Sequence, residues 1–137
     1  MLSSQQEDCS AKLADFGLAQ SLKDQSRGGS KAGTAGYVAP EIIDGGAFGP
    51  ASDMWALGCL LYAMLTVSLP FPVVSAKKTD AGSPVKSQQQ VDYSKLDLNY
   101  AQIDDDSKDL LLQLLVQDPT SRLTADEVLQ HPFVRSS

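Results

Sequence analysis

The longest apolar run in this chain, residues 54–65, constrains its fold more than any other feature. A helix that spans a membrane needs roughly 20 apolar residues, so this run is too short to cross one. As a helix, residues 54–66 would have no polar face, and such a helix is buried on all sides. We therefore expect a central core helix that the rest of the chain covers, with Cys59 as a small core residue.

Composition and charge narrow the class of protein. The 137 residues fit one domain, with 42% hydrophobic and 20% charged residues. A net charge of −6 and a single adjacent pair of cations, Lys77 and Lys78, argue against a nucleic-acid or membrane partner. Cys9 and Cys59 cannot build a disulfide framework, which indicates a reducing compartment. Residues 1–8 are too polar for a secretory signal, so we expect an intracellular, cytoplasmic protein.

Local patterns predict a strand, a long loop and then about four helices. Residues 11–14 are expected to form a strand that ends in a turn, and residues 18–32 form a polar loop. Pro40 is tolerated in a first turn and predicts a helix start, and the glycines at 45–46 end that helix. A break in composition at residues 73–90 predicts an exposed loop or a degraded helix.

Capping residues and one leucine stripe mark the remaining helices. Ser52 is the expected N-cap of the central helix. Negative charge at residues 104–106 suits the N-terminus of the next helix, because the helix dipole favours it there. The apolar stripe of that helix consists of Leu110, Leu111, Leu114 and Leu115. Thr124 and Glu127 have the spacing of a capping box for a last helix, which Pro132 ends.

Four motifs follow one another along these elements. They are Lys-Leu-Ala-Asp-Phe-Gly at 12–17, Gly-Thr-Ala-Gly-Tyr-Val-Ala-Pro-Glu at 33–41, Asp-Met-Trp-Ala-Leu-Gly at 53–58 and Asp-Pro-Thr-Ser-Arg at 118–122. Their joint order and spacing resembles the C-terminal lobe of a eukaryotic Ser/Thr protein kinase. Gly-Tyr-Val-Ala at 36–39 is similar to the calcium/calmodulin-dependent-kinase-like group.

The resemblance implies a mainly α fold: a partial kinase-like C-lobe with a short β-hairpin, an activation segment and about four helices. It predicts a partial kinase domain over residues 1–134 and a tail at 135–137. Within the domain, the expected parts are an activation segment at about 15–41 and a helical core at about 52–134, with a variable loop at about 72–92.

The resemblance assigns Asp15 to the aspartate that binds magnesium between the phosphates of ATP. A carboxylate oxygen suits this hard cation. Phe16 would pack under the N-lobe, and Gly17 would let the backbone turn. The alternative is an ordinary turn at the end of a strand.

A second group of residues is expected to form the substrate shelf, which would hold the substrate peptide. The shelf consists of Gly33, Thr34, Ala35, Gly36 and Tyr37. Thr34 would hydrogen-bond toward the catalytic aspartate region, and this form of the motif is typical of Ser/Thr rather than Tyr kinases. The alternative is a loop that leads into a helix and binds no ligand.

Three further residues are expected to have structural roles. Glu41 and Arg122 resemble the family's buried ion pair, which fastens the activation segment to the helical core, although two unrelated surface charges would fit the same pattern. Asp53 resembles the aspartate that accepts backbone amides of the catalytic loop, with capping of its own helix as the alternative. The candidate phosphorylation sites are Ser21, Ser26, Ser30 and Thr34, although most loop serines are merely solvated.

Other parts of the kinase machinery are missing from this sequence. We find no Gly-rich loop, no strand lysine with its helix glutamate, no His-Arg-Asp loop and no second metal-binding asparagine. We therefore expect Met1 to be an internal methionine of a longer kinase. The missing N-lobe segment would be a partner, and an apolar patch on the central helix would lie uncovered.

The complete protein is expected to transfer the γ-phosphate of ATP, with Mg²⁺, to Ser or Thr of protein substrates. This chain alone is expected to be inactive and to bind neither ATP nor Mg²⁺ tightly. One alternative is a non-catalytic kinase-like module that binds substrates or a partner. Another is a helical domain that carries the motifs by chance.

Overall fold

The computed structural model describes residues 12–23, 33–71, 91–100 and 103–135 of this chain. These ranges contain no strand and seven helical elements. The α-helices are α1 (Pro40–Ile43), α2 (Pro50–Thr66), α3 (Asp105–Leu114), α4 (Ala125–Gln130) and α5 (Pro132–Arg135), and the 3-10 helices are η1 (Phe16–Leu18) and η2 (Tyr93–Lys95). None of the described helices is both long and apolar enough to cross a membrane. The expected mainly α architecture is confirmed.

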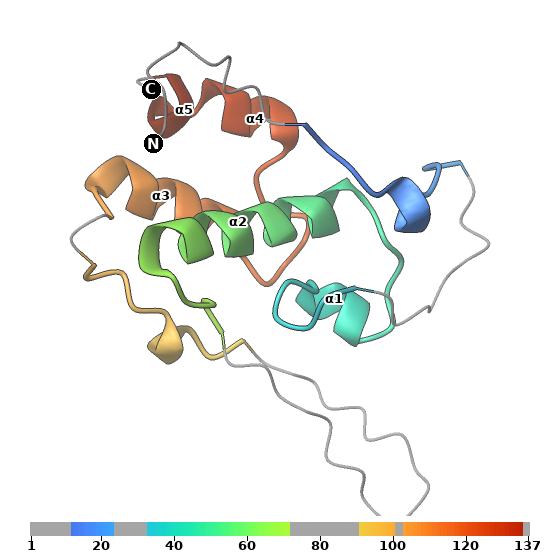
Figure 1. Cartoon of the computed structure of the whole chain (residues 1–137), viewed down its shortest axis with the longest axis horizontal. Helices are drawn as coiled ribbons and strands as arrows, with labels where there is room; N and C mark the ends of the chain where they lie inside the picture. The colour runs from blue at the N-terminus through green and yellow to red at the C-terminus, as the bar shows by residue number, and fades with distance from the viewer. Residues whose placement is uncertain (1–11, 24–32, 72–90, 101–102, 136–137) are drawn as a thin grey trace, which may run out of the picture.

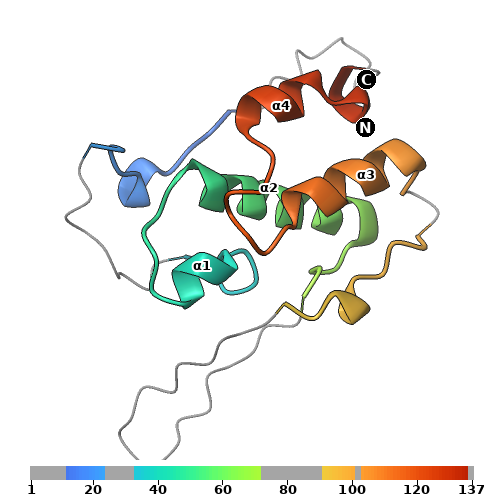
Figure 2. The ribbon, with the colours of Figure 1, turned by 180° about the vertical axis from the view of Figure 1, so that it is seen from behind.

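Helix α2 crosses the centre of the molecule, with α1 on one side and α4 and α5 on the other (Figure 1). Seen from behind, α3 lies alongside α2 (Figure 2), and these two helices pack against each other. Trp55, Cys59 and Tyr62 recur on one face of α2 and are almost fully buried. Burial raises the pKa of the Cys59 thiol to about 12, which suits an inert core residue as expected.

The contact between α2 and α3 depends on Gly58. A Cβ atom at this position would lie 2.9 Å from Leu114 Cβ and from Leu115 Cδ2, closer than side chains can approach. The predicted leucine stripe of α3 is confirmed, because all four of its leucines are buried. Glycine therefore lets the two backbones come together around this apolar seam.

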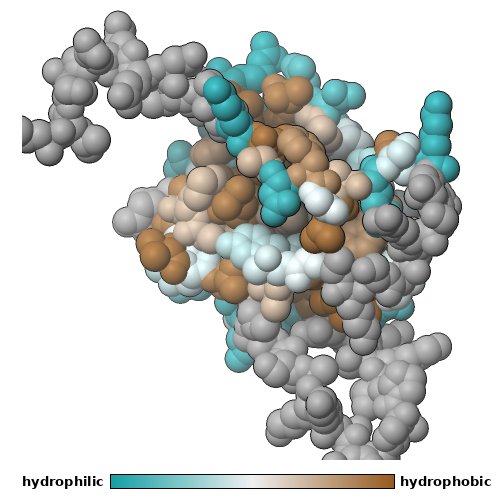
Figure 3. Space-filling view, turned by 45° about the vertical axis from the view of Figure 1, so that its right-hand side comes forward, coloured by the Kyte–Doolittle hydropathy of each residue, from teal (hydrophilic) through white to brown (hydrophobic). Residues whose placement is uncertain are grey.

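One face of α2 is not covered, so the expectation that this helix is buried on all sides is wrong. Leu60 and Met64 are 46% and 65% exposed, and Val67, just beyond the end of the helix, is 95% exposed. Apolar groups accordingly reach the surface of the molecule (Figure 3). The uncovered apolar patch expected on the central helix is therefore present in the structure.

Helix α2 also begins earlier than expected, because its N-cap lies three residues before Ser52. Its N-cap is Gly49 and Pro50 is its first residue, because the fixed φ of proline suits a first turn. The Ser52 hydroxyl lies inside the first turn, where it accepts from the Gly49 N–H at 3.1 Å and donates to the Gly49 carbonyl at 2.7 Å. The prediction that Ser52 is the N-cap is wrong, although Asp53 does lie in the first turn.

The ends of the other helices follow their predicted capping residues. Asp104 caps α3 by accepting from the Ser107 N–H at 2.8 Å. Thr124 and Glu127 form the capping box of α4. Pro132 both ends α4 and starts the short helix α5, which was not expected.

The prediction of a strand at residues 11–14 is wrong for residues 12–14, which are the part of that range that the structure describes. Residues 12–14 are exposed and have no strand conformation. A strand is stable only when a neighbouring strand accepts its backbone hydrogen bonds, and the described ranges contain none. The rest of the expected β-hairpin, and most of the loops predicted at 18–32 and 72–92, lie outside the described residues.

Candidate functional site

The segment expected to form the substrate shelf, called the shelf from here on, is a tight turn that leads directly into α1. The Tyr37 N–H donates to the Thr34 carbonyl at 3.1 Å. Gly33 and Gly36 have φ angles of 134° and 94°, a region that side chains rarely tolerate. The two glycines therefore allow the chain to turn here, and the shelf residues before Ala39 remain at least partly exposed.

A shallow hollow of about 310 Å³ separates the shelf from the first turn of α2. Thr34 and Tyr37 line it from the shelf, and Ser52 and Asp53 line it from α2. Partial burial raises the pKa of the Asp53 carboxyl above its usual value. The Asp53 backbone N–H donates to the Gly49 carbonyl at 3.4 Å, but its carboxylate accepts no hydrogen bond from the described residues, so the hollow offers a carboxylate acceptor that lacks a donor within this part of the chain.

Glu41 and Arg122, which sequence reasoning paired, lie in direct contact. Arg122 donates from Nη1 to Glu41 Oε1 at 2.9 Å and from Nη2 to Oε2 at 3.0 Å. The side chain of Arg122 is fully buried and that of Glu41 is 17% exposed. A bidentate pair of this kind fixes both distance and orientation between α1 and the segment after α3.

Further contacts of Arg122 were missed from the sequence. Its guanidinium also donates to the carbonyl oxygens of Val116 and Ala51. It stacks over the Trp55 ring with 5.2 Å between Cζ and the ring centroid. Carbonyl acceptors leave no signal in a sequence because every residue has one, so only the fold could identify these partners.

Asp15, Phe16 and Gly17 lie apart from the shelf, at and within η1 (Figure 1). Asp15 has a left-handed backbone with φ of 60°, and its Oδ1 accepts from the Gly17 N–H at 3.4 Å. Phe16 is 69% exposed. The structure therefore does not bring these residues together with the shelf.

Asp15 offers the right donor chemistry for Mg²⁺ but does not make a complete site. Carboxylate oxygens suit this cation, which is usually held by one or two carboxylates together with phosphate and water. Nowhere in the described ranges do three or more His, Cys, Asp or Glu residues gather as a metal site. A single exposed carboxylate does not fit a bound Mg²⁺, so we derive no step of phosphate transfer through this ion.

The candidate phosphorylation sites do not form a cluster in the described residues. Ser21 is exposed, and its hydroxyl accepts from the Lys23 N–H at 3.3 Å. Thr34 is exposed on the shelf. Ser26 and Ser30 lie outside the described residues.

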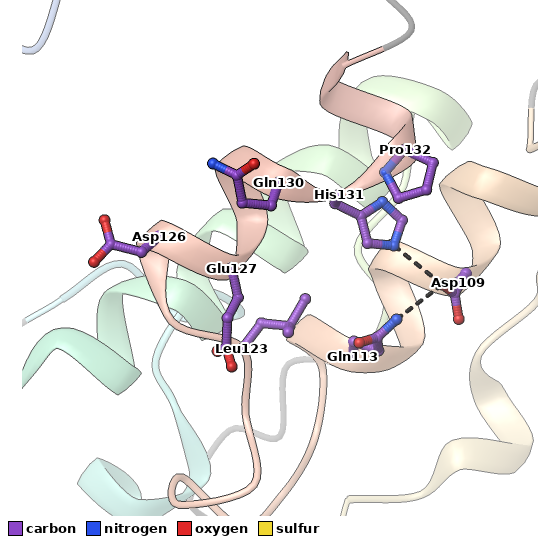
Figure 4. A pocket seen from close by; sticks show the side chains of 8 residues that line it. All are labelled: Asp109, Gln113, Leu123, Asp126, Glu127, Gln130, His131 and Pro132. Atoms are coloured by element: carbon purple, nitrogen blue, oxygen red, sulfur yellow. Dashed lines mark hydrogen bonds and ion pairs between the residues drawn. The ribbon is translucent and has the colours of Figure 1, made fainter.

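A second hollow, of about 530 Å³, lies between α3 and α4 (Figure 4). His131 is buried beside it, and its Nδ1 accepts from the Phe133 N–H at 3.2 Å. This bond leaves the ring proton on Nε2, which donates to Asp109 Oδ2 at 3.1 Å. Gln113 donates to the same oxygen at 2.8 Å. His131 therefore joins the last helices to α3.

Comparison with known proteins identifies the family. The protein kinase domain model matches residues 1–134, so this chain belongs to the protein kinase domain family. It is 41% identical over 134 residues to "Serine/threonine-protein kinase PKZ1" of Phytophthora infestans, covering 92% of this chain and 31% of that protein. It is 37% identical over 137 residues to "Calcium-dependent protein kinase 24" of Oryza sativa subsp. japonica, covering 98% of this chain and 25% of that protein.

A solved structure supports the same fold. The crystal structure of the Rad53 kinase domain and SCD2 in complex with AMPPNP matches with a TM-score of 0.54 and 30% sequence identity. The match covers 73% of this chain and 38% of that chain. This chain therefore spans about a third or less of the length of the curated relatives named here, and the expected class, a partial kinase-like C-lobe, is confirmed.

Proposed function

We propose that this chain is the C-terminal lobe of a protein Ser/Thr kinase, which in its complete form transfers the γ-phosphate of ATP to Ser or Thr of protein substrates. The observation that carries the proposal is the bidentate contact between Arg122 and Glu41. It fastens α1, and with it the adjoining shelf, to the helical core. A platform held in this way can present a substrate peptide in a fixed orientation, which is most of what catalysis of phosphate transfer requires.

The proposed roles of the shelf and of Asp53 follow from the hollow between them. The exposed turn at residues 33–37 would support the substrate chain, with Thr34 directed toward the reacting groups. Asp53 would accept backbone N–H groups of a catalytic loop supplied by the rest of the kinase. Its raised pKa supports this role, because an incompletely solvated carboxylate is stabilised by added donors.

ATP and Mg²⁺ would bind to the complete kinase rather than to this chain. In the complete kinase, Mg²⁺ would supply positive charge at the phosphates of ATP. Asp15 would contribute one carboxylate ligand. The base, the phosphate-binding lysine and the Gly-rich cover are not encoded in these residues, so we expect the chain alone to be inactive.

The test is to measure the size and activity of the native protein. An antibody against residues 33–41 would be used to find its mass in source cells and to isolate it for assay with labelled ATP and a mixture of peptides. We expect a protein of kinase size that labels Ser or Thr, and no labelling by the purified 14.6 kDa chain. A native protein of 14.6 kDa without activity would overturn the proposal.

The uncovered face of α2 favours one second candidate, a non-catalytic kinase-like module that binds a partner. Leu60, Met64 and Val67 follow one another on that face and are well exposed. Exposed apolar patches of this kind often mark an interface. A stable complex of the 14.6 kDa chain in source cells, lost on changing Met64→Lys, would favour this candidate over the kinase.

A further inference from the structure

Tyr93 contacts the surroundings of Arg122 by two separate routes. It lies in η2, which comes from a different part of the chain than α1, α2 or α3. Its hydroxyl contacts the Leu115 carbonyl and its ring contacts the Phe71 ring. Each of these neighbours adjoins a group that contacts the Arg122 guanidinium. None of the four motifs includes this residue.

The first route runs through aromatic rings. The Tyr93 and Phe71 rings meet edge to face, with 5.8 Å between centroids and an interplanar angle of 88°. Phe71 in turn stacks on Trp55 at 5.5 Å and 17°. Arg122 lies over the same Trp55 ring. Edge-to-face and stacked pairs have preferred geometries, so Tyr93 limits the tilt of the ring on which Arg122 lies.

The second route runs through the backbone after α3. The Tyr93 hydroxyl donates to the Leu115 carbonyl at 2.6 Å. The next carbonyl, of Val116, accepts from Arg122 Nε at 3.1 Å and from Nη2 at 2.9 Å. Only the φ and ψ angles of Val116 separate these two carbonyl groups, and steric clashes confine those angles to a few regions. The hydroxyl therefore helps to aim the Val116 oxygen at the guanidinium.

We propose that Tyr93 is a positioning residue for Arg122, and through Arg122 for Glu41 and the substrate shelf. The ring fixes the apolar surface under the guanidinium, and the hydroxyl fixes the acceptors at its edge. Both are needed because the bidentate contact with Glu41 requires a defined guanidinium plane as well as a defined distance. The importance of the shelf rests on the proposed kinase function, whereas the positioning of Arg122 does not.

The experiment compares Tyr93→Phe and Tyr93→Leu with the control Tyr62→Phe in the full chain. Tyr62→Phe makes the same chemical change as Tyr93→Phe, because the Tyr62 hydroxyl also donates to a carbonyl, that of Asp97, at 3.0 Å. Hydrogen exchange of the Arg122 Nε–H is followed by NMR, with the backbone N–H of Val128 in α4 as the reference for global opening. Fluorescence of Trp55, the single tryptophan, reports the state of its ring.

Loss of one hydrogen bond should speed exchange at Arg122, relative to Val128, roughly two- to tenfold in Tyr93→Phe. Tyr93→Leu should speed it further and also shift the Trp55 emission, because the ring contact is lost as well. Tyr62→Phe should leave the ratio of the Arg122 and Val128 exchange rates unchanged. Equal ratios in Tyr93→Phe and Tyr62→Phe, or an unchanged ratio in both Tyr93 variants, would overturn the proposal. None of these readouts depends on phosphate transfer. An inactive native protein would therefore refute the kinase function and leave the positioning role of Tyr93 unaffected.

Discussion

Arg122 binds both carboxylate oxygens of Glu41, at 2.9 and 3.0 Å, across 81 positions of sequence. The segment between them includes the whole of α2 and α3. This contact therefore joins α1 to the segment after α3. Helix α1 is a single turn of four residues, which is too short to be stable as a helix by itself.

Removing one partner of this pair should destabilise the protein strongly. Glu41→Ala leaves a fully buried guanidinium without its carboxylate, and we expect a loss of about 3–5 kcal/mol in the free energy of unfolding. Urea denaturation followed by circular dichroism measures it. Asp44→Ala, an exposed carboxylate just after α1, is the matched control and should change stability little. Equal losses in the free energy of unfolding would show that the ion pair stabilises the fold no more than an exposed carboxylate does.

Adding a methyl group at the seam between α2 and α3 should also destabilise the protein. Gly58→Ala improves helix propensity by about 1 kcal/mol but forces α3 away, because the new Cβ would lie 2.9 Å from Leu114 Cβ. We expect a net loss of about 1–3 kcal/mol. Gly49→Ala, whose Cβ would meet nothing within 4 Å, is the control. A more stable Gly58→Ala variant in thermal melts would contradict the close approach of the two helices.

The capping box of α4 should make stability depend on pH in the acid range. Hydrogen bonds from the Thr124 backbone N–H, and then from its hydroxyl, lower the pKa of Glu127. A lowered pKa in the folded state gives stability that is present above the ordinary glutamate value of about 4.3 and is lost as pH falls. We therefore expect Glu127→Gln to flatten part of the acid decline in melting temperature. Asp126→Asn, which removes a charge from the same first turn outside the capping box, is the control for a change of charge in itself. An unchanged slope in Glu127→Gln would count against the capping box.

The pH dependence of stability that comes from Asp53 should have the opposite sign to that from Glu127. Burial raises its pKa, so the folded state holds the proton more tightly than the unfolded state does. Stability is then lost as pH rises through the ordinary aspartate value of about 3.9 and the raised value above it. We expect Asp53→Asn to raise the melting temperature of this chain at neutral pH and to leave it unchanged at pH 3. The same substitution in a complete kinase should lower activity, because the proposed acceptor for the catalytic loop is lost.

A rise in melting temperature at pH 3 as large as that at pH 7 would show that the Asp53 charge is not the cause. Asp106→Asn, another exposed aspartate in the first turn of a helix, is the control for a change of charge in itself. It should not raise the melting temperature at neutral pH, because a negative charge at a helix N-terminus is favourable.

Local features of the fold were predictable from short-range patterns. The capping residue Thr124 satisfies a backbone donor three positions away, and the leucine stripe of α3 needs only the helical period to place it on one face. The start of α2 was missed, because Pro50 and Ser52 both carry start signals and only the observed helix decides between them. The strand at residues 11–14 was wrong, because a strand depends on a partner that local sequence does not contain.

The sequence by itself predicted the family and the order of the main helices from motifs and spacings that the linear chain carries, and the resemblance to that family predicted the pairing of Glu41 with Arg122. Only the tertiary structure decided which carbonyls Arg122 binds, how closely α3 approaches Gly58, and that Tyr93 contacts the surroundings of Arg122 from two sides. The physical reason is the range of the interactions. Caps and stripes join residues three or four positions apart, whereas these contacts depend on how whole helices pack, and packing is a property of the assembled core.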